Sequence, residues 1–210
     1  PEMKVVYIAP LKALVRERMV SWKKKFVDTL GKKLVELTGD YTPDIQALHN
    51  ADIVVTTPEK WDGISRNWQK RSYVKSVGLI IMDEIHMLGQ DRGAILEVIV
   101  SRMRHISWNT GHNVRLIGLS TSLANSHDLS DWLGIPHNGH GLFNFPHSVR
   151  PVQLKVHVQG YSGKHYCPRM NSMNKPCYNA IVNYAKSKPT LIFVSSRRQT
   201  RLTAFDLISL

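Results

Sequence analysis

An acidic pair directly follows an apolar run in the stretch IIMDEIHMLG, residues 80–89. Asp83 and Glu84 are adjacent, and His86 lies two residues further on. Two neighbouring carboxylates at the end of a buried strand repel each other, and a divalent cation relieves that repulsion. Mg²⁺ binds carboxylate oxygens, and a second carboxylate can orient and deprotonate a water molecule that attacks a γ-phosphate. The pattern therefore indicates a Mg²⁺ and nucleoside-triphosphate site, although a strand that ends in solvent also carries acids.

Four further polar clusters also follow apolar runs. They are Pro10 to Lys12, Thr38 to Asp40, Thr56 to Glu59 and Ser120 to Ser122. In an open α/β sheet, ligands bind at the carboxyl ends of the strands. Since every cluster falls at such an end, we expect all of them to share one binding edge with the acidic pair.

The elements that must position these clusters alternate along the chain. Apolar runs predict strands at 4–9, 33–39, 51–58, 78–84 and 114–121. Apolar residues at helical spacing predict a helix over 11–30 that Gly31 ends, and another over 95–106. Ser126 or Asp128 can cap a short helix after the last strand. Buried strands that alternate with helices predict an α/β fold with a parallel sheet covered on both faces.

The alternation breaks at residues 136–151, which are rich in glycine, proline and histidine. We interpret this region as the end of one domain and a connection to another. The expected organisation is a first domain over 1–145, a linker over 146–152 and the start of a second domain over 153–210.

Within the expected second domain, residues 151–160 alternate between apolar and polar side chains and predict a strand. A helix is expected to start near Pro176, and the apolar run 189–196 predicts a second strand. The sequence opens at Pro1, just before a strand, and stops at Leu210 inside a predicted helix. We therefore expect a piece of a longer protein.

The charge balance favours a polyanionic partner. The chain has 28 Lys and Arg against 16 Asp and Glu, a net charge of +12, and nucleic acid is the usual partner of such a protein. Acidic segments elsewhere in a longer protein are the alternative. Cys167 and Cys177 form no disulfide framework, and their spacing with His165 gives little support for a metal site. No apolar run approaches the length that spans a bilayer, so no membrane partner is expected.

IMDEIH resembles motif II of superfamily 2 helicases, in the DEIH form of the Ski2-like enzymes. The other stretches fall where the motifs of that family fall: IAPLKALVRER as motif Ia, LTGD as motif Ib, VTTPEKWD after it, GLSTSLAN as motif III and FVSSRRQT as motif IV. MDEIHMLGQDRG, WLGI and GLFNFPHSVRPV are similar to the Brr2 branch of these helicases. The resemblance covers essentially the whole chain.

The resemblance implies a RecA-like first helicase domain without its P-loop unit, followed by the start of a second RecA-like domain. It also implies an ATP-dependent helicase of 3′-to-5′ polarity that uses ATP and Mg²⁺. In this family the residue at Asp83 holds Mg²⁺ through water, Glu84 is the catalytic base, and His86 connects the ATP site to Ser120, Thr121 and Ser122 of motif III.

Residues on the nucleic-acid path are also implied by the resemblance. They are Pro10, Lys12, Thr38, Gly39, Thr57, Pro58, Arg92, Gly93, Ser195 and Arg197. The partners implied are DNA or RNA and the other subunits of a cointegrator-type complex. The family is associated with DNA repair and ribosome quality control, in the nucleus and the cytoplasm. For Lys12 and the two arginines after it, a solvated helix face is the alternative interpretation.

Two departures from the family pattern stand out. Thr121 replaces the alanine of the usual Ser-Ala-Thr, a polar and branched residue in a place expected to be packed. No GxxxxGKS or GxxxxGKT occurs in the chain, and that phosphate-binding loop is expected upstream of Pro1. We therefore expect these 210 residues alone to be inactive. A catalytically degenerate cassette that serves as a protein-interaction scaffold is the second hypothesis, and a P-loop ATPase of another class is a remote third.

Overall fold

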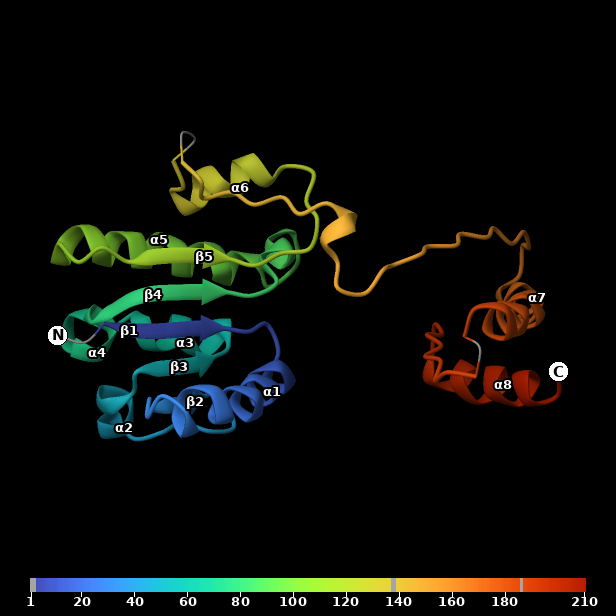
Figure 1. Cartoon of the computed structure of the whole chain (residues 1–210), viewed down its shortest axis with the longest axis horizontal. Coiled ribbons are helices and arrows are strands. Elements are labelled where there is room, and N and C mark those ends of the chain that lie inside the picture. Colours follow the sequence, from blue (N-terminus) through green and yellow to red (C-terminus); the bar gives the residue numbers. More distant parts are fainter. Residues whose placement is uncertain (1–2, 137–138, 186) are drawn as a thin grey trace. The chain divides into compact units, whose positions relative to one another are not determined.

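The computed structural model describes residues 3–136, 139–185 and 187–210. It divides into two units, Pro1–Phe145 and Pro146–Leu210, which are described separately. Unit 1 contains five strands: β1 (Lys4–Ile8), β2 (Leu34–Leu37), β3 (Ile53–Thr56), β4 (Val77–Met82) and β5 (Arg115–Gly118). They form one sheet in the order β2-β3-β1-β4-β5, and every pairing is parallel (Figure 1). The predicted parallel α/β fold and its five strands are confirmed.

Helices connect the strands of unit 1. They are α1 (Lys12–Trp22) with its π-helical continuation η1 (Lys23–Asp28), α2 (Ile45–Asn50), α3 (Pro58–Ser65), η2 (Trp68–Lys70), α4 (Ser72–Lys75), η3 (Ile85–Gly89), α5 (Gly93–Thr110) and α6 (Ser126–Leu133). Gly31 follows the first of these with a left-handed φ of 63°, as predicted for a helix end. Helix α6 is preceded by Asn125, whose side chain makes no capping bond, so the predicted cap at Ser126 or Asp128 is wrong.

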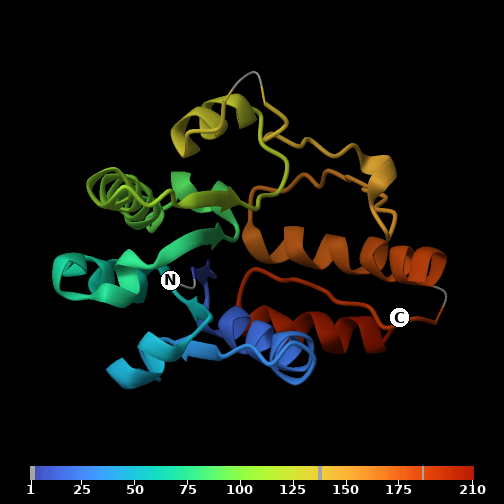
Figure 2. The ribbon, with the colours of Figure 1, turned by 60° about the vertical axis from the view of Figure 1, so that its left-hand side comes forward.

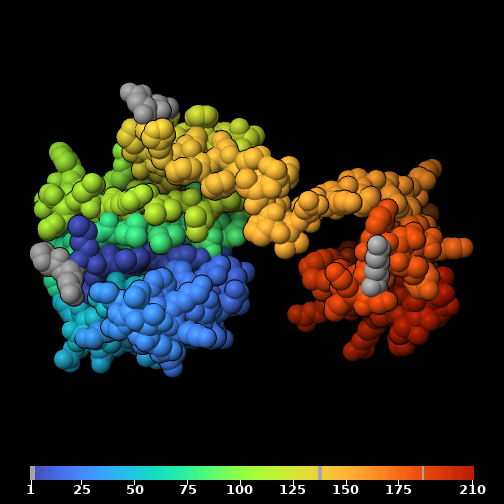
Figure 3. All heavy atoms as spheres, viewed as in Figure 1, coloured from blue at the N-terminus to red at the C-terminus, as the bar shows by residue number. Residues whose placement is uncertain are grey.

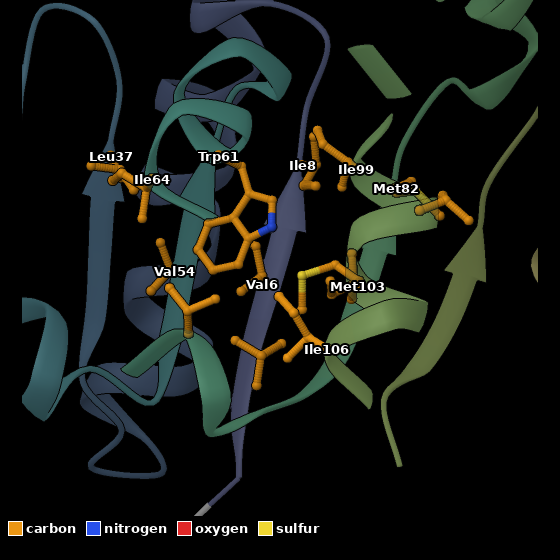
Figure 4. Packing of buried hydrophobic residues seen from close by; sticks show 14 of the residues in the cluster. Val6, Ile8, Leu37, Val54, Trp61, Ile64, Met82, Ile99, Met103 and Ile106 are labelled. Carbon is orange, nitrogen blue, oxygen red and sulfur yellow. The ribbon is translucent and has the colours of Figure 1, made fainter. Parts of the chain in front are cut away.

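The core of unit 1 lies on both faces of the sheet. On one face, Tyr7 and Val55 pack with Val15 of α1. On the other face, strand residues pack against α3 and α5, where Figure 4 shows the ring of Trp61 beside Val6 and near Met103. Neighbouring side chains of a strand point to opposite faces of the sheet, so each apolar run contributes side chains to the core on both faces.

Gly93 begins α5 at a point of close backbone approach. A Cβ atom added there would lie 1.6 Å from the carbonyl oxygen of Leu88, so no other residue fits without moving the chain. Gly93 is buried at this contact. The close packing against Leu88 is enough to explain a glycine at this position, without a contact to nucleic acid.

Unit 2 is helical in its described residues. It contains η4 (His147–Val149), α7 (Tyr166–Ala180), η5 (Ile181–Ala185) and α8 (Arg197–Ile208), and α7 and α8 run side by side (Figures 1 and 2). Helix α7 starts ten residues before the predicted start, and Pro176 lies inside it.

The strands predicted at 151–160 and 189–196 are not formed. Residues 150–160 are all exposed to solvent, and Tyr161 just after them is partly buried. Figure 3 shows this stretch as a narrow line of atoms. A strand needs a neighbour for its backbone N–H and C=O groups. The described residues of unit 2 offer these segments no such neighbour, which is why an alternating or apolar pattern alone did not produce a strand.

Candidate active site and nucleic-acid edge

The five polar clusters meet at one edge of the sheet. The last residues of the strands lie in one row, because Thr56 pairs with Leu37 and Ile8, and Met82 pairs with Ile8 and Gly118. The cluster Thr56 to Glu59 begins in that row, and each of the other four begins one or two residues beyond it. The parallel pairing therefore brings segments that are far apart in sequence to one side of the molecule.

Asp83 continues β4 by one residue, and Glu84 then leaves the strand. The backbone N–H of Asp83 donates to the carbonyl of Ile8 at 2.9 Å. Glu84 has a left-handed backbone (φ 57°, ψ 43°), and its N–H donates to Oδ1 of Asp83 at 3.0 Å. Non-glycine residues rarely adopt this conformation, and such residues concentrate at functional sites. The chain therefore turns directly after Asp83, and Glu84 does not continue the strand.

His86 lies between the acidic pair and motif III. Its Nε2 is 3.2 Å from Oε2 of Glu84, and its Nδ1 is 3.5 Å from the backbone nitrogen of Thr121. The backbone N–H of Ile85 donates to the carbonyl of Leu119 at 3.0 Å, which ties η3 to the end of β5. One imidazole ring therefore contacts both segments through its two nitrogens.

Motif III differs from the sequence-based expectation in its exposure to solvent. Ser120, Thr121 and Ser122 are all exposed, so the expectation that Thr121 occupies a packed place is wrong. The contact that His86 makes with this segment uses the main chain of Thr121 and not a hydroxyl. These residues lie beyond the last strand, where the side chains have solvent on one side, and a polar side chain costs little there.

Tyr7 contacts the acidic pair from β1, and the sequence analysis missed it. Its hydroxyl donates to Oδ2 of Asp83 and accepts from Nε of Arg18 at 3.3 Å. Burial, followed by the hydrogen bond to Asp83, raises the pKa of Tyr7 to about 12. The signal for this contact is a tyrosine in the otherwise aliphatic run KVVYIA, because a buried hydroxyl needs a partner.

Lys12 and Gly39 are brought together by an ion pair. Nζ of Lys12 lies 2.6 Å from Oδ1 of Asp40, and Nη2 of Arg16 lies 3.2 Å from Oδ2. The hydrogen bond and charge of Lys12 lower the pKa of Asp40. Thr38 is buried, and its hydroxyl donates to Oε1 of Glu36 at 3.0 Å and accepts from the backbone N–H of Tyr41 at 3.3 Å.

Arg92 joins two other clusters of this edge. Its Nη1 donates to the carbonyl of Pro10 at 2.8 Å, and its Nε donates to Oε1 of Glu59 at 2.5 Å. Thr57 is buried immediately before α3, and Pro58 is the first residue of that helix. The guanidinium of Arg92 thus already has protein partners at the place where the resemblance puts a nucleic-acid contact.

Ser195 and Arg197 belong to unit 2 and are described within it. The hydroxyl of Ser195 hydrogen-bonds the hydroxyl of Tyr166. Arg197 is the first residue of α8 and is exposed, and the cap of that helix is Ser196, which accepts from the N–H of Gln199 at 3.2 Å. The helix start leaves the Arg197 side chain available to solvent.

The carboxylates fit a Mg²⁺ ion that is bound mostly by water and phosphate. Among the described residues, no three His, Cys, Asp or Glu side chains gather as a complete metal site. Mg²⁺ commonly binds to one or two carboxylates and completes its shell with waters and substrate phosphates. Asp83, with one oxygen bonded to a hydroxyl and the other to a backbone N–H, matches that kind of ligand. Cys167 and Cys177 are free thiols.

No helix in the part of the chain that the structure describes is both long and apolar enough to cross a membrane.

A parallel sheet with an acidic pair at the end of an interior strand is the arrangement expected of a RecA-like helicase domain. Residues 1–129 match the family of DEAD/DEAH box helicases, and the chain belongs to that family. The chain is similar over its whole length to activating signal cointegrator 1 complex subunit 3 of Dictyostelium discoideum, with 69% identity. It is 70% identical to the DExH-box ATP-dependent RNA helicase DExH14 of Arabidopsis thaliana, with 99% of the chain covered. It is 58% identical to the RQC trigger complex helicase SLH1 of Saccharomyces cerevisiae, with 100% covered.

The chain covers only a small part of these relatives: 9% of the Dictyostelium protein, 10% of the Arabidopsis protein and 11% of the yeast protein. The crystal structure of the DUF1998 helicase MrfA bound to DNA and AMPPNP is similar to this chain with a TM-score of 0.68 and 18% identity. That likeness covers 98% of this chain and 29% of the other, and it shows the fold. The predicted Ski2-like, DExH-box family and RecA-like fold are confirmed.

Proposed function

We propose that this chain is part of an ATP-dependent nucleic-acid helicase, and that the carboxyl edge of the sheet both hydrolyses ATP and follows the nucleic acid. The observation that carries the proposal is the row of five polar clusters at that edge, in which Asp83 and Glu84 follow the interior strand β4. Fold alone does not imply function, so the residues of the site bear the argument.

In the proposed mechanism, Asp83 would hold Mg²⁺ through water, and Glu84 would accept a proton from the attacking water. When bound, Mg²⁺ shields the charge of the phosphates. His86 touches Glu84 with one nitrogen and the Thr121 main chain with the other, so it is placed to transmit a change at the acidic pair to motif III. The imidazole can serve both contacts because its two nitrogens act separately.

The nucleic acid is proposed to pass the loops that begin with Pro10, Thr38 and Thr57. Lys12 and Gly39 adjoin each other there, and Lys12 supplies a positive charge that can exchange Asp40 for a phosphate. The net charge of +12 supports such a partner. Thr57 and Pro58 at the start of α3, and Ser195 and Arg197 at the start of α8, would contribute contacts near helix N-termini. Phosphate contacts carry little base information, so the proposal covers DNA and RNA.

The wider role is proposed from the relatives. Their names include a cointegrator complex subunit, an RNA helicase and a ribosome-quality-control helicase. We infer a parent helicase of 3′-to-5′ polarity that works with other complex subunits in ribosome quality control or DNA repair, in the nucleus and the cytoplasm. Within unit 2, residues 153–210 are proposed to be the start of the second RecA-like domain, after a linker over 146–152.

The test of the proposed chemistry is ATP hydrolysis by the parent helicase. Glu84→Gln keeps the shape of the side chain but removes the base, so nucleic-acid-stimulated hydrolysis is expected to fall by at least about 100-fold. Glu97→Gln, at an exposed position of α5, is the matched control and is expected to retain wild-type turnover. Wild-type turnover by Glu84→Gln would show that the base is wrongly assigned.

The 210 residues alone are proposed to be inactive, because they carry Asp83 and Glu84 without a GxxxxGKS or GxxxxGKT loop to hold the phosphates. Release of phosphate in a malachite-green assay should equal the blank with and without nucleic acid. Stimulated turnover by this chain would overturn the expectation.

A degenerate cassette that acts as a protein scaffold is the second candidate, and Thr121 is the observation that favours it. The structure weakens this candidate, since the His86 contact uses a backbone N–H that any residue except proline supplies. In the parent helicase, Thr121→Ala should change unwinding little. A gain of tenfold or more would favour the degenerate cassette.

A further inference from the structure

Tyr7 places a hydroxyl inside an apolar cluster on the α1 face of the sheet. The residue is 3% exposed and packs with Val15 of α1 and with Val55 of β3. Its ring meets that of Trp22 edge-on, with centroids 4.9 Å apart and an angle of 70°. An apolar side chain would fill this space without burying a polar group. A buried hydroxyl is unfavourable unless it has a hydrogen-bond partner, so the partner of the Tyr7 hydroxyl matters.

The strand register directs that hydroxyl to Asp83. Tyr7 of β1 lies opposite Ile81 of β4. Asp83 is two residues beyond Ile81, and side chains two apart on a strand share a face. Tyr7 and Asp83 therefore point to the same side of neighbouring chain segments, and the hydroxyl reaches Oδ2 of the carboxylate.

Arg18 determines which way the hydrogen bond runs. A guanidinium has donors and no acceptor, so the 3.3 Å contact between Nε of Arg18 and the Tyr7 hydroxyl must use an arginine N–H. The single proton of the Tyr7 hydroxyl is then left for Asp83. Arg18 comes from α1, so this helix holds Tyr7 by its ring and by its oxygen.

Both oxygens of Asp83 are occupied by this arrangement. Oδ2 accepts from Tyr7, and Oδ1 accepts from the backbone N–H of Glu84 at 3.0 Å. The carboxylate therefore has a fixed orientation, with its remaining lone pairs pointing outward from these two donors. Groups that orient a metal ligand in this way commonly change metal affinity when they are removed.

We propose that Tyr7 is a positioning residue that fixes the Asp83 carboxylate for Mg²⁺, with Arg18 holding Tyr7 in place. The inference rests on the proposed role of Asp83 and adds a residue from another strand to it. Tyr7 does not touch the nucleotide in this account, and it acts through the carboxylate alone.

The test is metal binding by the parent helicase carrying Tyr7→Phe, which removes the hydroxyl and keeps the ring. Mn²⁺ serves as the probe, and free Mn²⁺ is measured by electron paramagnetic resonance in the presence of ADP. We expect the affinity for Mn²⁺ to fall about tenfold. Binding of nucleic acid without nucleotide should be unchanged.

Tyr73→Phe is the matched control, because Tyr73 is a second buried tyrosine of unit 1 and lies away from the acidic pair. It should leave Mn²⁺ affinity unchanged. Arg18→Gln should lower the affinity in the same direction, and it keeps the inference testable if Tyr7→Phe does not fold. Wild-type Mn²⁺ affinity in a folded Tyr7→Phe protein, or in Arg18→Gln if only that variant folds, would overturn the inference.

Asp83→Asn separates the two levels of the proposal. If Asp83→Asn keeps the wild-type metal affinity, the proposed function of the site is wrong, and the inference falls with it. If Asp83→Asn loses metal binding while Tyr7→Phe retains it, only the role of Tyr7 is wrong.

Discussion

Glu84 combines an unfavourable backbone with a position at the centre of the site. Its left-handed conformation turns the chain directly after Asp83, and its carboxylate reaches His86 at 3.2 Å. A side chain in this region costs on the order of 1–2 kcal/mol relative to the ordinary helical conformation. The burial of the following residue, Ile85, and its backbone hydrogen bond to the carbonyl of Leu119 offset this conformational cost.

A pair of substitutions at Glu84 measures this strain. Glu84→Gly should give a free energy of unfolding about 1 kcal/mol higher than Glu84→Ala, because glycine adopts the left-handed conformation without strain. At Glu97, inside α5, the order should reverse, with alanine the more stable by about 1 kcal/mol. Urea denaturation of the four variants provides the values. Equal stability of the two Glu84 variants would show that the backbone there is unstrained.

The shared edge could be predicted from sequence because each polar cluster follows an apolar run, but individual side-chain contacts could be predicted only between residues that are close in sequence. Asp83, Glu84 and His86 lie within four residues, so their spacing alone reveals them. Tyr7 is 76 residues from Asp83, and its contact depends on β1 and β4 being neighbours. The partners of Arg92 were missed for the same reason, since Glu59 and Pro10 come from other strands' loops.

At the scale of elements, α3 and α5 are joined by a partly buried ion pair. Asp62 of α3 accepts from Nη1 of Arg102 at 2.7 Å and from Nη2 of Arg66 at 2.5 Å. The hydroxyl of Ser65 also accepts from Nη1 of Arg102, at 2.9 Å. Burial raises the pKa of Asp62, but the hydrogen bonds and charges of Arg66 and Arg102 outweigh it, and the pKa is lowered overall. The pair therefore links α3, which contains the last residues of the VTTPEKWD stretch, to α5, which follows motif II.

Asp62→Asn should lower the free energy of unfolding by about 3 kcal/mol at neutral pH, because it leaves the half-buried charge of Arg102 without its partner. A carboxyl with a lowered folded pKa stabilises above its unfolded pKa and loses that effect as the pH falls through the folded pKa. The difference between wild type and variant should therefore shrink below about pH 4. Thermal denaturation across pH measures it.

Asp28→Asn, at an exposed position after α1, is the control and should have little effect at any pH. A wild-type stability for Asp62→Asn at neutral pH would mean that the ion pair contributes no net stabilisation to the contact between α3 and α5.

Element prediction succeeded where a run was both apolar and paired. The runs at 51–58 and 78–84 became buried strands between neighbours of the sheet. The run at 189–196 is also rich in apolar residues, but it has no described partner strand and is irregular. Sequence patterns report which side chains prefer burial, whereas a strand also requires a neighbour for its backbone.

At the scale of the whole chain, the two units differ in their cores. The buried hydrophobic residues of the described structure all lie in unit 1, from Val6 to Leu133. The buried residues of unit 2 are polar: Asn174, Gln199 and Thr203. Hydrophobic burial is the main favourable term in folding, so unit 1 carries the stability of this chain.

Hydrogen exchange of the 210-residue chain should reveal this difference. Amides of β1 and β4 are expected to be protected to nearly the global unfolding free energy, because these strands are central in the sheet. Amides of α7 and α8 should exchange at least about 100-fold faster, since local opening there exposes little buried apolar area. Equal protection in both units, read by mass spectrometry of peptic fragments, would contradict the assignment of the core.

The most direct test of the central claim is strand displacement by the parent helicase on a duplex with a 3′ overhang. The wild-type protein should unwind it only with ATP and Mg²⁺. Glu84→Gln should bind the duplex with wild-type affinity and unwind it at least about 100-fold more slowly, while Glu97→Gln should unwind normally. Unwinding by Glu84→Gln at the wild-type rate would show that the carboxyl edge of this sheet is not the site that powers the helicase.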